Sequence, residues 1–109
     1  MLHILNLPKP YSKTMEQLLQ SVTQMVKYLN GNDHDPKNHE QVGIMQSTLG
    51  ILFCQVESLA WAEKLVKEHS TDPNAQKLMS VAEESSLRLL KGAASLFSST
   101  AQITSPNSH

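Results

Sequence analysis

The chain has 109 residues, a net charge of −1 and 39% apolar residues, enough for one domain with a single core. The nine Lys and Arg residues are spread along the chain, so the concentrated basic face that nucleic-acid binding requires is not expected. Aromatic residues make up only 5%. A core that rests on Leu, Val, Met and Ala favours helices over a sheet.

The single cysteine, Cys54, excludes an intrachain disulfide and a cysteine-based metal site. Its apolar neighbours Leu52, Phe53 and Val56 predict a buried, unreactive thiol. The N-terminus lacks the basic segment and long apolar run of a signal peptide. The charge-free stretch 41–56 is shorter than the roughly 20 apolar residues that span a bilayer. We therefore predict a cytoplasmic protein of a reducing compartment, without a membrane segment.

Residues 1–11, MLHILNLPKPY, are apolar and are broken by Pro8 and Pro10, which prevent a helix. We predict an N-terminal arm. It would pack along a groove of the domain, or dock onto a partner or a second copy.

A first helix is predicted over about 14–30, beginning at Ser12 or Thr14. Thr14 and Gln17 have the spacing of a capping box, and Gly31 suits the left-handed conformation that ends many helices. Apolar residues recur at spacings of three and four, as on one face of a helix: Met15, Leu18, Val22, Met25 and Leu29.

The linker that follows contains His34 and is closed by His39, with acidic residues beside both. Such side chains can hold zinc. However, Pro36 breaks any helical spacing between them, and Asp, His and Asn are ordinary loop residues. We interpret the segment as a solvated linker and predict no metal ion and no cofactor.

A second helix is predicted over about 40–69, with the charge-free stretch 41–56 in its first half. Its bulky residues share one side: Val42, Met45, Leu49, Leu52, Val56 and Leu59. Its small residues share the opposite side, which ends at Trp61: Gly43, Ser47, Gly50, Cys54 and Ser58. A helix that is apolar on both sides is expected to be buried on both sides. We predict that the small residues allow a second backbone to approach closely.

A third helix is predicted over about 73–98. Asp72 is a good N-cap, and Pro73 suits the first helical position, where its missing N–H costs nothing. Residues 99–109 are rich in serine and are predicted to form a flexible tail.

Together these elements predict an all-α fold, a three-helix antiparallel bundle built on a long helical hairpin within a single domain, 1–98. The first helix is too short to cover the whole hairpin, so the far end is a candidate protein-binding site. We expect six residues to contact a partner there: Leu59, Trp61, Leu65, Val66, Leu78 and Val81. Homo-oligomerisation would be another way to complete such a bundle.

Part of the chain resembles the tetratricopeptide pattern of helix pairs. The matching residues are Leu49, Gly50, Phe53, Ala62, Val66 and Pro73. The resemblance implies two short helices with a break near Glu57–Ser58, where the bundle interpretation has one continuous helix.

No catalytic set is recognisable. The histidines lie at the ends or in linkers, the four glycines are isolated, and no Ser or Cys is evidently paired with a histidine. We therefore interpret the chain as a non-enzymatic protein-protein interaction module: an adaptor, an assembly subunit or a small chaperone. The alternative is a self-assembling structural protein, for example a homodimer with coiled-coil packing.

Overall fold

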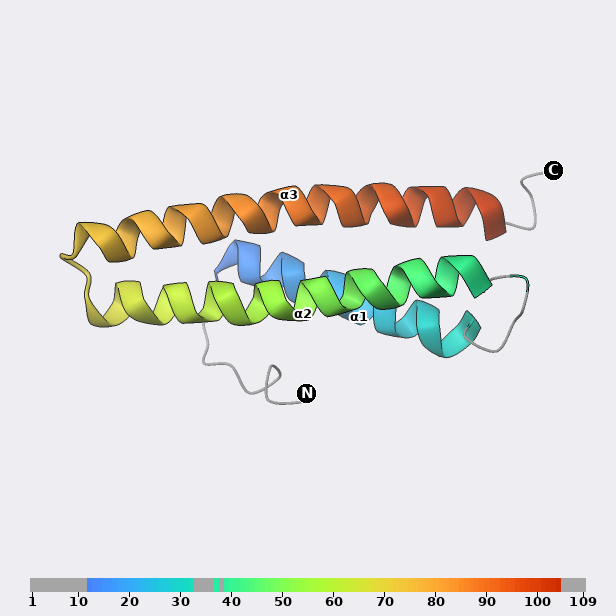
Figure 1. The fold of residues 1–109 in the computed structure, drawn as a ribbon, viewed down its shortest axis with the longest axis horizontal. Helices are drawn as coiled ribbons and strands as arrows, with labels where there is room; N and C mark the ends of the chain where they lie inside the picture. The colour runs from blue at the N-terminus through green and yellow to red at the C-terminus, as the bar shows by residue number, and fades with distance from the viewer. Residues whose placement is uncertain (1–11, 33–36, 38, 105–109) are drawn as a thin grey trace.

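The computed structural model describes residues 12–32, 37 and 39–104, with side chains described up to Ser98. Within these ranges the chain forms three α-helices: α1 (Lys13–Asn32), α2 (His39–Glu68) and α3 (Pro73–Thr104). Helices α2 and α3 form a long antiparallel hairpin, and α1 lies behind them in the view of Figure 1. The molecule is elongated, 56 × 24 × 20 Å. The predicted all-α, three-helix bundle is confirmed.

The N-terminus of α1 is capped by Ser12, whose Oγ accepts a hydrogen bond from the backbone N–H of Met15 (3.1 Å). The predicted capping box of Thr14 and Gln17 is wrong, because Thr14 is buried and turns toward α3. At the other end, α1 continues through Gly31 to Asn32, so Gly31 does not end the helix as predicted.

The N-terminus of α3 agrees with the sequence prediction. Oδ1 of Asp72 accepts a hydrogen bond from the backbone N–H of Asn74 (2.9 Å), and Pro73 is the first helical residue. The C-terminus differs, since α3 runs to Thr104. The predicted end of the third helix near residue 98 is therefore six residues too early, and 105–109 lie outside the described residues. Alanine favours a helix, Ser, Thr and Gln weaken one only slightly, and the next proline after Pro73 is Pro106.

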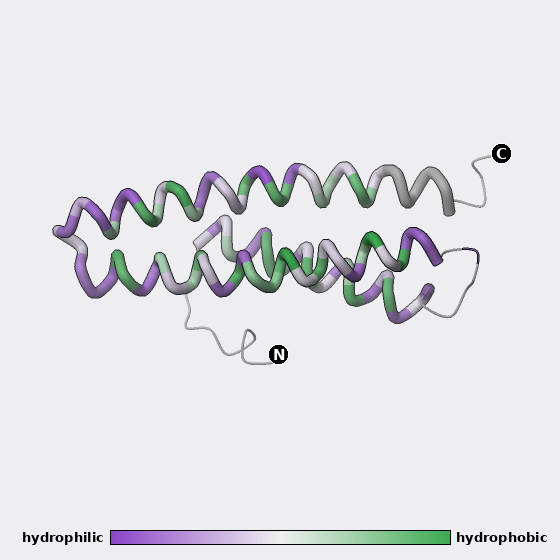
Figure 2. The backbone as a smooth tube through the Cα atoms, in the orientation of Figure 1, coloured by the Kyte–Doolittle hydropathy of each residue, from purple (hydrophilic) through white to green (hydrophobic). Residues whose placement is uncertain are grey.

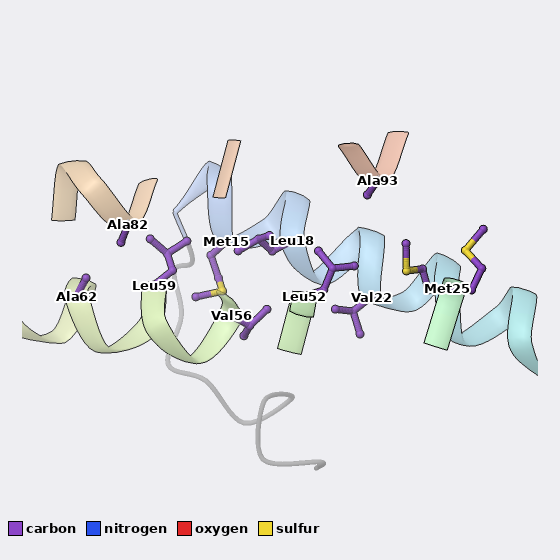
Figure 3. Packing of buried hydrophobic residues seen from close by; sticks show 11 residues of the cluster. Met15, Leu18, Val22, Met25, Leu52, Val56, Leu59, Ala62, Ala82 and Ala93 are labelled. Atoms are coloured by element: carbon purple, nitrogen blue, oxygen red, sulfur yellow. The ribbon is translucent and has the colours of Figure 1, made fainter. Parts of the chain in front are cut away.

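The core lies where α1 runs along the hairpin. Figure 2 shows hydrophobic turns of α2 beside α1 and frequent hydrophilic residues near the hairpin turn. Figure 3 shows Leu52, Val56 and Leu59 of α2 facing side chains of α1, with small alanines of α3 closing the core. The bulky side of α2 is buried as predicted at Val42, Met45, Leu52, Val56 and Leu59, whereas Leu49 is half-buried and packs against this core.

A polar contact inside the bundle holds α2 and α3 in register. Nε2 of Gln55 donates to the backbone O of Ala82 (3.1 Å) and to Oγ of Ser86 (2.8 Å). The hydroxyl of Ser86, which is fully buried, donates in turn to the same Ala82 carbonyl (2.7 Å). These bonds satisfy polar groups that burial would otherwise penalise.

Helix α2 is continuous from His39 to Glu68, through Glu57 and Ser58. The break that a tetratricopeptide-like helix pair requires is absent, so that resemblance does not extend to the fold. The segment 55–59 contains no Gly or Pro that would interrupt a helix.

Candidate functional site

One groove of the hairpin is filled by α1. Its first turn touches both long helices: the Ser12 hydroxyl hydrogen-bonds to the carboxylate of Glu63 on α2, and Thr14 Oγ1 donates to Glu83 on α3 (3.4 Å). The turns of α2 after Glu63 and the first turns of α3 lie beyond α1. The prediction that α1 covers only part of the hairpin is thus confirmed.

The opposite groove is left open. On α2, Ile51 and Ser58 stand four residues before and three after Gln55, so they border the residue that bonds α3. Both are exposed, which places them away from α1. They belong to a row at alternating spacings of three and four: Ile44, Ser47, Ile51, Cys54, Ser58, Trp61 and Leu65. No member of this row is charged.

The matching edge of α3 is also apolar near the hairpin turn. Leu78 and Ser85 stand four residues before and three after Ala82, whose carbonyl accepts the Gln55 bond. Leu78 and Val81 are exposed. We call the open face the surface formed by four residues of α2 and two of α3: Ile44, Ile51, Trp61, Leu65, Leu78 and Val81.

The open face gathers most of the exposed large hydrophobic residues. Among the described residues seven such side chains are exposed, and five belong to it, including Ile51 at 55% and Trp61 at 60%. The other two are Val26 on α1 and Leu87, which stands four residues after Glu83 and so on the α1 side of α3. Scattered apolar side chains are normal on a surface, but a concentration on one face is not.

The small residues of α2 do not meet another backbone among the described residues. Gly43 and Gly50 are exposed, and a Cβ placed on either would find no atom within 4 Å. The predicted burial of both sides of α2 is therefore not found in the described part of the chain, and the N-terminal arm 1–11, which could cover the second side, lies outside it. The reason is geometric: three helices share one central core, so α1 and α3 both pack against the bulky side of α2.

Cys54 is exposed, and the prediction of a buried thiol is wrong. That prediction relied on Leu52 and Val56, which are close in sequence. Residues two apart on a helix point in different directions, and both neighbours face the core while Cys54 belongs to the outer row.

The six residues predicted to contact a partner fall into different environments. Leu59 has no exposed surface and is a core residue, so its inclusion was wrong. Leu65 and Val66 are half-buried, whereas Trp61, Leu78 and Val81 are exposed. The sequence interpretation missed Ile44 and Ile51. Their spacing of seven, continued at Ser58 and Leu65, was the signal that could have found them.

Charged residues of both signs surround the open face. On α2, Glu40 and Glu68 stand at the two ends of the row, four residues before Ile44 and three after Leu65, and Glu57 and Lys64 lie on its outer flank. On the outer side of α3 are three basic residues and one acidic residue, a net charge of +2: Lys77, Arg88, Lys91 and Glu84. All eight are exposed, and Arg88 pairs with Glu84 at 3.2 Å.

No three His, Cys, Asp or Glu among the described residues lie close enough to hold a metal ion. A shallow hollow on α1 is lined by Leu19, Gln20, Thr23 and Gln24, none of them ionisable. His34 lies outside the described residues, so the interpretation of its segment as a solvated linker stays a prediction.

By length and composition alone, α2 is the one helix in the described part of the chain that could cross a membrane, a test that core helices of soluble proteins also pass. The stretch 41–56 alone is shorter than the roughly 20 apolar residues that span a bilayer, but the whole of α2, with 30 residues, is long enough. Only 28% of the apolar window of α2 is buried in the bundle, consistent with the exposed row.

Comparisons of the chain with protein-family models, with curated proteins and with solved structures found no match. The geometry itself therefore defines the class: a three-helix bundle with one filled groove and one open, apolar groove. Its distinguishing feature is the open face.

Proposed function

We propose that the protein is a non-enzymatic helical interaction module that binds protein through the open face. It would act as an adaptor, an assembly subunit or a small chaperone. The observation that carries this proposal is the uncharged row from Ile44 to Leu65, which is exposed as far as Trp61 and half-buried at Leu65. The row runs for roughly 32 Å at 1.5 Å per residue. Alternating spacings of three and four over that length are what helix–helix packing uses.

The energetics favour a partner that covers several residues at once. Fully burying one large apolar side chain stabilises a complex by about 1.5–3 kcal/mol. Association itself costs an estimated 4–15 kcal/mol in lost freedom. A partner that covered Trp61 alone would not offset this cost, whereas one that lay along Ile44, Ile51 and Trp61 would gain up to about 4.5–9 kcal/mol, within the lower part of that range. Trp61 is the natural anchor, because interface hot spots are enriched in tryptophan.

A cytoplasmic location forms part of the proposal. The exposed thiol of Cys54 lies within the outer row of α2. In a reducing compartment it stays a thiol and behaves as a small, weakly polar residue that packs well in an interface.

Site-specific photo-crosslinking in the cells that make the protein tests the proposal. A crosslinking residue at Ile51 is compared with one at Leu87, because the two positions are similarly exposed (55% and 50%) on different faces. We expect crosslinks to a polypeptide from position 51 and far fewer from position 87. Equal yields from both positions, or none from position 51, would overturn the proposed binding face.

A further inference from the structure

The far end of the open face comprises Trp61 on α2 with Leu78 and Val81 on α3. We propose that its occupant is the N-terminal arm of the same chain, residues 1–11, which wraps around α2 as an extended strap. The arm shields Trp61 until a partner displaces it, while the rest of the face, 44–51, stays open. This inference rests on the proposed function, because it names what controls access to the same face.

The arm joins the helices at the end of the hairpin that α1 does not cover. Ser12, the residue after the arm, stands directly before α1 and hydrogen-bonds to Glu63 on α2. Trp61 comes two residues before Glu63, about 200° around the same helix, so it lies on the opposite side of α2. A chain that leaves Ser12 and follows the surface of α2 therefore meets Trp61 before it reaches the open face.

The arm is long enough for this path. Half the circumference of a helix about 11 Å across is roughly 17 Å, and the axes of packed helices lie about 8–10 Å apart. The path from Ser12 around α2 to Leu78 and Val81 on α3 is therefore roughly 27 Å. The residues 1–11 span about 34 Å in an extended polyproline II conformation, at about 3.1 Å per residue.

The sequence of the arm has a period of three that suits the space between two helices. The polyproline II helix has three residues per turn, so residues three apart share an edge. Polar residues recur at that spacing: His3, Asn6 and Lys9. The other two edges carry apolar or aromatic residues: Met1, Ile4, Leu7 and Pro10 on one, and Leu2, Leu5, Pro8 and Tyr11 on the other. One edge therefore faces water while the two other edges contact α2 and α3.

Trp61 gives the far end the chemistry that binds such a segment. Proline-containing extended segments dock on aromatic side chains, because their conformation is largely formed before binding. Trp61 is the only tryptophan of the chain and is 60% exposed. Pro8 and Pro10 restrict the free arm, so ordering it costs less conformational entropy. The arm contains no acidic residue, so its docking buries no carboxylate.

A segment of the same chain has an advantage over a separate molecule. A short tether holds the arm near the face at a roughly millimolar local concentration. Its docking also avoids the loss of translational freedom that association between two molecules costs. Elsewhere among the described residues, the exposed large hydrophobic side chains are Val26 on α1 and Leu87 on α3. Neither surface offers the arm as much apolar area as the far end.

The fluorescence of Trp61 in the purified full chain tests the docking. We expect acrylamide to quench Trp61 less in the wild type than in Leu5→Lys, where the emission should also move to longer wavelength. The released fraction should rise at least roughly tenfold in that variant, because one large apolar side chain loses its burial. Asn6→Lys adds the same charge on the polar edge and should behave as the wild type. Equal quenching in the wild type and Leu5→Lys, with unchanged helical circular dichroism, would overturn the inference.

Photo-crosslinking locates the docked arm. A crosslinking residue at Val81 is compared with one at Leu87, because the two positions on α3 are similarly exposed (54% and 50%). Leu87 follows Glu83, the partner of Thr14, by one turn, so an undocked arm reaches it as well. We expect crosslinks to residues 1–11 of the same chain from position 81 and few from position 87, at about 100 µM and about 1 µM alike. Equal yields from both positions would overturn the assigned site.

Other occupants of the far end give different results. Crosslinks between two chains that disappear on dilution would assign it to a second copy and overturn docking within one chain. A Trp61 that becomes shielded only when vesicles of phosphatidylcholine are added would assign the far end to a membrane. That result would overturn both this inference and the proposed function.

The effect of the arm on partner binding separates the two proposals. In cells, Leu5→Lys should raise the yield of crosslinks from position 51 to another polypeptide, because the released arm frees Trp61, whereas Asn6→Lys should not. An equal yield in the wild type and Leu5→Lys would overturn the control of access. Partner crosslinks from position 51 together with equal quenching of Trp61 in the wild type and Leu5→Lys overturn the arm alone. A docked arm without partner crosslinks from position 51 in any variant overturns the proposed function alone.

Discussion

Helix α2 carries two apolar rows with the same spacing and opposite environments. Met45, Leu52 and Leu59 have no exposed surface, whereas Ile44 and Ile51, each one residue earlier, are 41% and 55% exposed. The two rows differ little in hydrophobicity, so composition does not explain the difference. The row facing the bundle axis is covered by α1 and α3, and the other faces a groove that the described residues leave empty.

The comparison teaches that apolar character alone does not decide whether a helix surface is buried. The number and positions of the neighbouring helices decide which apolar surface is covered. Each helix of a three-helix bundle buries one stripe. A second stripe on the same helix therefore requires a helix from elsewhere, which is why the open row of α2 directs attention to a partner.

The largest expected effect separates the two rows at adjacent residues. In dilute, monomeric protein, Leu52→Ala should lower the free energy of unfolding by about 2–5 kcal/mol, because it leaves a cavity in the core. Ile51→Ala should change it by less than about 0.5 kcal/mol, since the side chain is exposed and alanine favours helix. Urea unfolding measures both. Similar losses in the two variants would mean that the outer row is packed within the single chain.

A smaller effect is expected at the boundary between the rows. Gln55→Ala removes two hydrogen bonds to α3 but leaves Ser86 bonded to the Ala82 carbonyl, so we expect a loss of about 1–2 kcal/mol. Gln46→Ala, on the exposed side of the same helix, is the matched control and should cost less than about 0.5 kcal/mol. A double-mutant cycle with Ser86→Ala should give a coupling of about 0.5–1.5 kcal/mol. Zero coupling would contradict the role of this contact in holding the register.

The sequence was sufficient for the elements and the fold class, because the signals there are local. The apolar spacing located α1, and Asp72–Pro73 located the start of α3 to the residue. It was not sufficient for the environment of α2. Both sides of that helix lack charge, so periodicity allowed either to be buried, and only the positions of α1 and α3 decide between them. The errors at Cys54 and Leu59 both follow from this ambiguity.

The candidate site was predictable only in part for the same reason. Unequal helix lengths were enough to indicate an uncovered hairpin end near Trp61 and Val81. The spacing of seven could have drawn attention to Ile44 and Ile51, but their exposure required knowing that α1 fills the opposite groove. That is a long-range property, set by contacts such as those of Ser12 with Glu63, and the spacing alone does not encode it.

A third test examines the point where α1 stops covering the hairpin. Ser12→Ala removes both the N-cap of α1 and its bond to Glu63, so we expect a loss of about 1 kcal/mol, up to about 2. Asp72→Ala removes only a local cap at the start of α3 and should cost less, about 0.5–1 kcal/mol. Chemical denaturation of both variants checks the order. A larger loss for Asp72→Ala would show that Ser12 contributes nothing beyond local capping.

The smallest expected effect is a gain in stability where the other variants lose it, and it tests the outer side of α2 most directly. Gly50 lies in mid-helix with open space around it, so Gly50→Ala should stabilise the monomer by about 0.5–1 kcal/mol through helix propensity alone. The reverse change in the covered row, Ala62→Gly, should destabilise by at least about 1 kcal/mol, because Ala62 is buried. Thermal unfolding of dilute samples measures both. A loss of stability in Gly50→Ala would mean that a neighbouring backbone already lies against Gly50, and the two sides of α2 would then be alike.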